Sequence, residues 1–393
     1  PVTTRGAGTG LVGGCTPICG GVVICTTKMN KILSYDLDNF AVTVQPGVLL
    51  QDLADDALAH GLLYPPDPGE KFATLGGNVS TNAGGMRAVK YGATRDYVRS
   101  MTVVLPSGEV VKFGSSVSKT SSGYSLLNLM IGSEGTLGII TKATLKLQPI
   151  PPYRFDLLAV FSDPEQALDV VPKIMQAGIN PTSVEYMDNS YVRGTADYLE
   201  FKGAPHYENG IYVIITVETF SEDELDLKME QLDELCSAAG AVDVLEADER
   251  IWDMRRNCQE SVRLISLVSL TDDVVVPVNE IAGTIKFIMK IGEKYPFPVK
   301  INAHIGDGNL HIVLCKCELS DEEWENKVEA FHKEVYTYAY SIGGRLAGEH
   351  GIGAKKLREM ETYTPAGELA IMRTIKAAMD PQLILNPGKI FDL

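Results

Sequence analysis

The sequence lacks any run of about 20 consecutive apolar residues, the length that a membrane-spanning helix needs. It is also poor in basic residues, with 35 Lys and Arg against 51 Asp and Glu and a formal net charge of -16. Because this charge repels polyanions, we expect no nucleic-acid partner. The first residues lack the basic, apolar and small-residue pattern of a signal peptide. We therefore expect a soluble, cytoplasmic protein without a membrane span.

Cysteine is scarce and irregularly spaced. The seven cysteines form no C-x-x-C pair, which argues against a disulfide framework and against a cysteine-rich metal site. We interpret them as reduced thiols, most of them small apolar fillers. With 393 residues, 45% of them apolar, the chain is long enough for two or three folded domains.

Proline and glycine mark the domain organisation. The first 150 residues contain short apolar runs separated by glycine, which is typical of a loop-rich α+β domain. Three prolines within 148–152 interrupt the chain and predict a boundary there. From 151 to 345, strands alternate with helices, which are predicted to begin at Ser162 or Asp163, at Ser221 and at 320, so we expect a sheet with helices on one face. Residues 346–393 are predicted to be a C-terminal segment with helical content.

Three glycine-rich segments lie in the first domain. Gly8, Gly10 and Gly13 match the G-x-G-x-x-G pattern of nicotinamide-binding folds. That motif requires a helix directly after the glycines, and Gly14 and Pro17 prevent one, so an NAD site is disfavoured. Successive backbone N–H groups in such a loop can still bind a diphosphate, although a plain tight turn explains the loop equally well.

The other two glycine-rich segments, 74–85 and 132–138, are also expected to be loops, and they combine small residues with amide and hydroxyl side chains. This mixture suits close approach by a polar cofactor. The second of them leads into a strand at Ile139, whose backbone could pair with an aromatic base. A turn remains the alternative for each segment alone, and their co-occurrence in one domain favours a cofactor.

A histidine pair lies in the second domain. The segment 299–314 predicts two strands joined by Gly-Asp-Gly, with His304 directly opposite His311 and their Cβ atoms ~5 Å apart. Two imidazoles so placed can chelate a divalent metal. Glu349, framed by Gly348 and Gly351, is the predicted third ligand. A lone strand histidine is more often a core residue, but three ligand-type residues in two glycine-framed motifs favour a metal site.

The order of these segments, with Gln-Pro-Gly at 45–47, Tyr-Pro-Pro-Asp-Pro-Gly at 64–69 and Asn-Ala-Gly-Gly at 82–85, resembles the vanillyl-alcohol-oxidase type of FAD-linked oxidases. Within that superfamily the chain resembles the glycolate oxidase and D-lactate dehydrogenase branch along its whole length. The resemblance implies an α+β fold: an FAD-binding domain, an antiparallel-sheet substrate domain and a helical tail that returns to the flavin domain. It also implies a β-α-β segment ahead of Arg5, so part of the N-terminal domain is expected to be missing from this sequence.

The resemblance further implies which residues bind FAD. The early loops contain no histidine that could tether the flavin, so noncovalent FAD is expected. The first loop would contact the diphosphate, the segments around 66–85 would line the flavin, and 134–140 would hold the adenosine side. The implied contacts are Arg5, Gly6, Ala7, Gly8, Thr9, Gly10, Pro66, Asp67, Gly69, Thr74, Gly76, Gly77, Asn78, Thr81, Asn82, Gly84, Gly85, Glu134, Gly135, Gly138, Ile140 and Asn386.

The same resemblance assigns roles in the second half. It makes His304, His311 and Glu349 the ligands of a divalent metal, which could be Zn, Mn or Fe, and His350 the catalytic base. Arg255, by its position in the motif, would bind the substrate carboxylate, with Arg256 as the fallback and a solvated helix residue as the alternative.

These roles predict FAD-dependent oxidation of a small 2-hydroxy acid by hydride transfer to flavin N5, with a metal-polarised hydroxyl and a histidine base. Valine at 313 favours a small apolar substrate tail, so D-lactate to pyruvate is preferred and glycolate comes next. The alternatives are another acid such as 2-hydroxyglutarate, or an FAD-binding electron-transfer subunit without turnover. A protein acceptor, for example an electron-transferring flavoprotein, is the expected partner.

Overall fold

The computed structural model describes residues 1–392 and divides the chain into two compact units. Unit 1 contains Pro1–Gly85, Tyr91–Ile150 and the chain from Glu349 onward. Unit 2 contains Met86–Lys90 and Pro151–Gly348. The chain therefore returns to unit 1 at the peptide bond between Gly348 and Glu349.

Unit 1 is built on a five-stranded sheet whose strand order is β3-β4-β8-β6-β7. All neighbouring strands in it are antiparallel. Two short pairs complete the strands, β1 with β2 in parallel and β5 with β9. The strands are β1 (Val2–Arg5), β2 (Val22–Cys25), β3 (Ile32–Asp36), β4 (Ala41–Val44), β5 (Leu62–Leu63), β6 (Val98–Val104), β7 (Val110–Gly114), β8 (Ile139–Lys146) and β9 (Gln148–Pro149).

The core of unit 1 forms where helices α1 (Leu50–Ala59) and α2 (Leu75–Thr81) pack on this sheet. Helix α1 buries Leu50, Leu53 and Ala57, the spacing of one helical face, and Gly61 ends the segment with a φ of 73°. Helix α2 corrects a sequence prediction, because the glycine-rich segment 74–85 was expected to be a loop throughout. Its buried Leu75 and Val79, four residues apart, pack into the core and override the low helix propensity of its two glycines.

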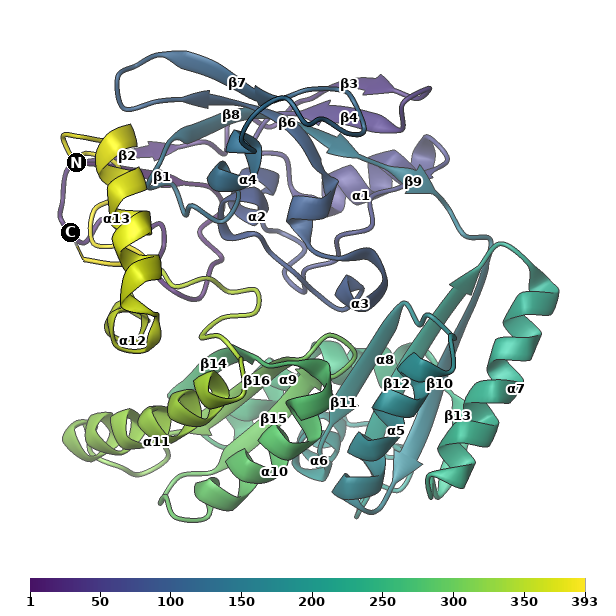
Figure 1. Ribbon diagram of the computed structural model, residues 1–393. Coiled ribbons are helices and arrows are strands. Elements are labelled where there is room, and N and C mark those ends of the chain that lie inside the picture. The colour runs from purple at the N-terminus through teal and green to yellow at the C-terminus, as the bar shows by residue number, and fades with distance from the viewer. Residues whose placement is uncertain (393) are drawn as a thin grey trace. The chain divides into compact units, whose positions relative to one another are not determined.

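The C-terminal part of unit 1 contains α12 (Leu357–Tyr363) and α13 (Ala366–Met379), and α4 (Leu126–Met130) lies earlier in the chain (Figure 1). The short helix α3 (Ala88–Tyr91) belongs to unit 2 except for its last residue. Helix α13 carries a buried ion pair: Lys376 Nζ lies 2.6 Å from Asp380 Oδ2. The same ammonium donates to the carbonyl oxygens of Thr136 and Leu385. Lys376 thus joins the helix to the turn before β8 and to the C-terminal loop.

Unit 2 contains a seven-stranded sheet in the order β13-β10-β12-β11-β15-β16-β14, antiparallel throughout. The family resemblance implied an antiparallel sheet in this domain, and the structure has one. The strands are β10 (Tyr153–Phe161), β11 (Ser183–Met187), β12 (Ile211–Thr219), β13 (Asp243–Glu246), β14 (Ser269–Val275), β15 (Val299–His304) and β16 (Asn309–Cys315).

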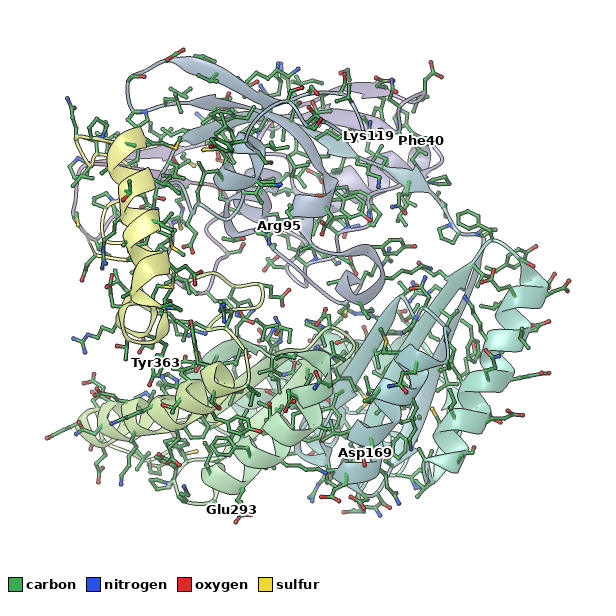
Figure 2. All side chains as sticks on the ribbon, in the orientation of Figure 1. Phe40, Arg95, Lys119, Asp169, Glu293 and Tyr363 are labelled. Carbon is green, nitrogen blue, oxygen red and sulfur yellow. The ribbon has the colours of Figure 1, made fainter. Side chains whose placement is uncertain are left out.

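Helices cover both faces of this sheet, which corrects the prediction of one covered face (Figure 1). One layer contains α5 (Pro164–Gln176), α7 (Glu222–Ala238), α10 (Ile281–Gly292) and α11 (Asp321–Ser341); the other contains α6 (Asn189–Tyr198), α8 (Glu249–Arg256) and α9 (Cys258–Ser261). The reason is that the central strands are buried on both sides: all nine residues of β12 are buried. Acidic side chains such as Asp169 and Glu293 project from the exposed side of the first layer (Figure 2).

Short side chains cap the long helices of unit 2. Asp163 accepts a hydrogen bond from the amide of Glu165 at the start of α5, and Ser221 accepts one from Glu224 in α7. Ser320 and Glu323 form a reciprocal capping box at α11. These caps stand where the sequence placed the helix starts. Within residues 1–392, no helix is both long and apolar enough to cross a membrane.

The buried pair in α13 yields a stability prediction. Lys376→Met leaves the Asp380 carboxylate buried without its cation, so we expect the free energy of unfolding to fall by ~3–5 kcal/mol. The matched control is Lys294→Met, which removes the cation of an exposed pair with Glu334 in unit 2 and should cost about 0–1 kcal/mol. Urea unfolding followed by circular dichroism measures both. Equal losses in the two variants would contradict the anchoring role of Lys376.

Candidate functional site: two glycine-framed loop clusters and a histidine pair

The predicted cofactor residues all lie in unit 1 and mostly in loops. Arg5 ends β1, and 6–10 follow it without a helix, as the argument against an NAD site required. Residues 66–69 precede α2, Thr74 is its N-cap, and Asn82 ends it in a left-handed conformation. Glu134, Gly135 and Gly138 lie between α4 and β8. Ile140 lies at the start of β8, and Asn386 lies in the C-terminal loop.

The first loop folds back on its own arginine. Gly8 has a φ of 81°, and a Cβ placed on it would lie 2.3 Å from Nη2 of Arg5. The guanidinium therefore covers a glycine turn, which gives the turn positive charge. A Cβ on Gly10 would meet no atom within 4 Å, so the loop is open on that side. A guanidinium next to unhindered backbone suits a diphosphate.

Neighbouring loops of unit 1 approach one another closely at glycine residues. A Cβ on Gly6 would lie 2.1 Å from Thr74 Oγ1, and one on Gly85 would lie 2.2 Å from the carbonyl oxygen of Asp67. Asn386 Nδ2 donates to the carbonyl oxygens of Gly14 and Glu134, at 2.8 and 2.7 Å. The loops singled out from the sequence are thus packed on one another, although Gly14 and Asn386 are 372 residues apart in the chain.

Several polar side-chain atoms in these loops and in the adjoining β1 and α2 are buried without a hydrogen bond inside the described part of the chain. They are Thr4 Oγ1, Tyr64 Oη, Thr74 Oγ1, Asn78 Nδ2 and Asn386 Oδ1. A buried polar atom without a partner costs free energy, so a group of them in one region indicates a polar ligand.

In unit 2, strands β15 and β16 form the hairpin that carries His304 and His311. The observed register pairs His304 with Asn309 and Asn302 with His311, so the prediction that the two histidines are directly opposite is wrong. The turn closes earlier than expected, because the amide of Asp307 donates to the carbonyl oxygen of His304 and Gly308 adopts a φ of 89°. The histidines are diagonal neighbours on one face instead. Their ring centroids lie 5.1 Å apart, so both imidazoles are close enough to bind one metal ion.

A fully buried carboxylate, Glu185 of β11, joins two of the predicted site residues. Its Oε1 lies 2.8 Å from Nδ1 of His304, and its Oε2 lies 2.6 Å from Nη2 of Arg255. Burial alone would raise the pKa of Glu185, but the adjacent His304 and Arg255 outweigh it and hold the pKa below its usual value. A carboxylate can only accept, so Nδ1 of His304 donates to it, and Nε2 is the ring atom with the lone pair that a metal requires.

A second buried carboxylate, Asp273 of β14, lies opposite His311 in the sheet. Its Oδ1 accepts from Asn309 Nδ2 at 2.9 Å, and its Oδ2 accepts from the amide of Gly348 at 3.0 Å. A Cβ on Gly348 would collide with Asn309, so only glycine fits there. Asp273 therefore connects the hairpin to the last residue of unit 2, directly before Glu349.

The two candidate arginines differ in their surroundings. Arg255 is buried on α8 and is held by Glu185, whereas Arg256 pairs with Glu249 and Asp253 on the exposed side of the helix. The local geometry favours Arg255 over Arg256 as the residue that would bind a substrate carboxylate, because the guanidinium plane of Arg255 is fixed beside the histidine pair.

Glu349 and His350 begin the final part of unit 1. A Cβ on Gly84 would lie 2.9 Å from Oε2 of Glu349, so the carboxylate packs against the segment 82–85. Nε2 of His350 lies 3.8 Å from Oε1 of Glu349. Farther along the segment, the carboxylate of Glu134 accepts hydrogen bonds from the amides of Ile352 and Gly353. Burial raises the pKa of Glu134 to about 7, although these amides oppose the shift.

Sequence reasoning missed Glu185, Asp273 and Asn309 as site residues. Glu185 and Asp273 each stand next to apolar residues of a strand, as in Ser-Val-Glu-Tyr-Met, and a carboxylate in such a run was the available signal. Asn309 is part of the His-x-Gly-Asp-Gly-Asn-x-His motif, where it was read only as a hairpin residue.

Two family models match the chain. The C-terminal domain of FAD linked oxidases matches residues 150–390, and an FAD binding domain matches residues 1–114. The chain therefore belongs to the FAD-linked oxidase family.

The relatives make the family assignment narrower. A D-lactate dehydrogenase of Anaerostipes hadrus is 48% identical over 402 residues, covering 99% of this chain and 84% of that protein. The glycolate oxidase subunit GlcD of Bacillus subtilis is 37% identical, covering 100% of this chain and 84% of that subunit. The protein is an FAD-dependent dehydrogenase of the D-lactate dehydrogenase and glycolate oxidase type.

Solved structures agree with the fold. The structure of p-cresol methylhydroxylase with substrate bound has a TM-score of 0.80 at 18% identity and covers 100% of this chain and 84% of that one. An alkyldihydroxyacetonephosphate synthase has a TM-score of 0.73 at 19% identity, with 98% and 71% covered. The fold is thus the α+β fold of vanillyl-alcohol-oxidase type enzymes, as the sequence predicted.

The loops of unit 1 fit FAD. The Arg5-covered glycine turn suits its diphosphate, and the buried polar atoms of Thr74 and Asn78 suit the hydrogen-bonding edge of a ring system. The individual FAD contacts named from the sequence remain predictions.

The Glu185 bridge yields a second stability prediction. Glu185→Gln removes the buried negative charge that Arg255 and His304 share, so we expect a loss of ~3–5 kcal/mol in unfolding free energy. Glu249→Gln, which removes an exposed partner of Arg256 on the same helix, is the control and should change stability by less than about 1 kcal/mol. Both tryptophans, Trp252 and Trp324, lie in unit 2, so urea unfolding followed by tryptophan fluorescence reports on this unit. Unchanged stability in Glu185→Gln would show that the bridge does not stabilise unit 2.

Proposed function

We propose that this protein oxidises a small 2-hydroxy acid, with D-lactate to pyruvate favoured and glycolate as the next choice. The observation that carries the proposal is the buried cluster in which Glu185 holds His304 and Arg255 beside His311. Such a cluster offers imidazole ligands for a metal and a cation for a carboxylate, and a 2-hydroxy acid needs both. The names of the relatives, a D-lactate dehydrogenase and a glycolate oxidase subunit, support the same substrate class.

His304, His311 and Glu349 are the proposed ligands of a divalent metal. Zn, Mn and Fe all accept two imidazoles and a carboxylate. Chain connectivity supports Glu349, because the preceding Gly348 is held by Asp273, the residue opposite His311, and adjacent Cα atoms are ~3.8 Å apart. A metal bound by these residues would polarise the substrate hydroxyl and lower its pKa.

Arg255 is the proposed partner of the substrate carboxylate. A guanidinium has five N–H groups in a fixed plane, so its bond to Glu185 fixes the orientation of that plane, and the planar group can bind a carboxylate through two N–H groups. Val313, on the same face of β16 as His311, is fully buried in an apolar cluster with Trp252 and Met254. An apolar wall next to His311 favours the methyl group of lactate over the second carboxylate of 2-hydroxyglutarate.

His350 is the proposed base. Oxidation removes the hydroxyl proton and a hydride from the same CHOH group, and the imidazole of His350 accepts that proton. FAD, when bound, supplies the acceptor for the hydride. The acidic balance of the chain supports a protein as the next electron acceptor, and we propose one of the electron-transferring flavoprotein type.

Anaerobic reduction of the bound flavin tests the function. In the wild-type holoenzyme, D-lactate should bleach the flavin absorbance, because hydride leaves the substrate and no oxygen reoxidises the cofactor. In His350→Ala the rate constant of bleaching should fall by ~10²–10⁴-fold, the usual contribution of a general base. Stopped-flow absorbance measures the rates, and FAD and metal content are measured on the same samples.

The control for this variant is His206→Ala, which removes an exposed histidine of unit 2 and should leave the rate unchanged. Near-normal bleaching in His350→Ala would remove His350 as the base. A wild-type flavin that stays oxidised with D-lactate but bleaches with glycolate or 2-hydroxyglutarate would correct the substrate.

Metal content tests the ligand set. The double variant His304→Ala with His311→Ala should lose the stoichiometric metal of the wild-type protein, because a single carboxylate cannot retain it. Elemental analysis by mass spectrometry measures the loss, again with His206→Ala as the control. Full metal occupancy in the double variant would contradict the proposed chelate.

A further inference from the structure

Glu134 has a backbone conformation that glutamate rarely adopts. It lies in the turn between α4 and β8 with a φ of 50°, flanked by Gly132 and Gly135 at φ values of 78° and 74°. A left-handed conformation favours glycine, so a glutamate there is unfavourable unless its side chain is needed. The side chain is buried, with 7% of the residue exposed. The sequence assigned Glu134 to FAD, but its carboxylate has other partners.

Each oxygen of the Glu134 carboxylate accepts one backbone amide of the segment after His350. Oε1 accepts from Ile352 at 2.8 Å, and Oε2 accepts from Gly353 at 2.8 Å. A Cβ on Gly351 would lie only 2.8 Å from Oε1, so glycine at 351 allows this close approach. Two charge-assisted hydrogen bonds to consecutive amides determine both the position and the direction of that short segment.

The backbone of Glu134 connects the same point to α2 and to the C-terminal loop. Its amide donates to the carbonyl oxygen of Ser80 in α2 at 2.8 Å, and its carbonyl oxygen accepts from Asn386 Nδ2 at 2.7 Å. Oε2 also lies near the place that a Cβ on Gly14 would occupy, at 3.4 Å. One residue therefore ties α2, the C-terminal loop and the segment 349–353 together.

We propose that Glu134 is a positioning residue that holds the Glu349–His350 segment in place relative to α2 and the C-terminal loop. The segment is supported at both ends, by Gly84 against Glu349 and by Glu134 at Ile352 and Gly353. Loss of the carboxylate removes one support, so His350 and Glu349 move without any change in their own chemistry. The catalytic consequence rests on the proposed function, in which these two residues are the base and a metal ligand.

Two variants distinguish the effect of losing the Glu134 carboxylate from the effect of disturbing the fold. Glu134→Gln keeps the shape but turns one acceptor into an NH2 group that faces an amide N–H. Glu134→Gly removes the side chain and suits the left-handed backbone, so it should fold without strain. Because a misplacement of ~1 Å can cost ~10²-fold in rate, we expect the rate constant of flavin reduction by D-lactate to fall by about 10–100-fold. FAD content should change little, because the backbone of Glu134 keeps its hydrogen bonds to Ser80 and Asn386 in both variants. The KM for D-lactate should also change little, because Arg255, the proposed partner of the substrate carboxylate, lies in unit 2.

Hydrogen exchange gives a readout that does not depend on turnover. In both variants the amides of Ile352 and Gly353 should exchange at least about 10-fold faster than in the wild-type holoenzyme, and the metal should dissociate more readily on dialysis against a chelator. Formate should restore part of the reduction rate in Glu134→Gly by replacing the carboxylate, and should not affect Glu134→Gln. Glu109→Gln, an exposed glutamate of unit 1, is the control.

Unchanged exchange at Ile352 and Gly353, or a wild-type rate of flavin reduction in both variants, would overturn the proposal. Loss of FAD from both variants without rescue by formate would also overturn it, because Glu134 would then act on the cofactor. If the wild-type flavin is not reduced by D-lactate or by the other hydroxy acids, the proposed function fails. The exchange and metal measurements would still decide the role of Glu134.

Discussion

Carboxylates that are buried away from water have to be paired, and this requirement organises both units of the protein. Glu185 lies between His304 and Arg255, Asp273 between Asn309 and Gly348, and Glu134 against two consecutive amides. An isolated buried carboxylate would be costly, so each one acts as a fixed point to which cationic groups or backbone N–H groups must come. The elements with the candidate site residues are held at these points.

The chemistry of the carboxylates matches the needs of the site. Glu185 determines the tautomer of His304 and the plane of Arg255 at once, so two functional groups are oriented by one residue. Asp273 and Glu134 accept hydrogen bonds from backbone amides instead, Asp273 from Gly348 and Glu134 from Ile352. Gly348 is the last residue of unit 2, and Ile352 follows shortly after the chain has returned to unit 1. These hydrogen bonds also require glycine at 348 and 351, since a Cβ at either position would approach the neighbouring side chain too closely.

Much of the fold could be predicted from local signals. The caps at Asp163, Ser221 and Ser320 and the apolar periodicity of α1 depend only on residues a few positions apart, and the structure has helices there. The hairpin of β15 and β16 was predicted, but its register was not, because the choice of turn depends on the packing of Gly308 against Val276. Helix α2 was missed because its two glycines mask the buried Leu75 and Val79.

Some residues of the candidate site could likewise be predicted from the sequence, and others could not. Short motifs identified His304, His311, Glu349 and His350 as candidates, and the order of glycine-rich segments indicated the FAD-binding fold. Both signals can be recognised because the residues of each motif lie within a few positions of one another. Glu185 and the amide-binding role of Glu134 could not be read in this way. Glu185 is 119 residues from His304, and Glu134 is 218 residues from Ile352. Local sequence by itself determined which chemical groups this protein possesses, whereas only the tertiary structure decided which buried carboxylate orients each of them, because those pairings arise from long-range packing.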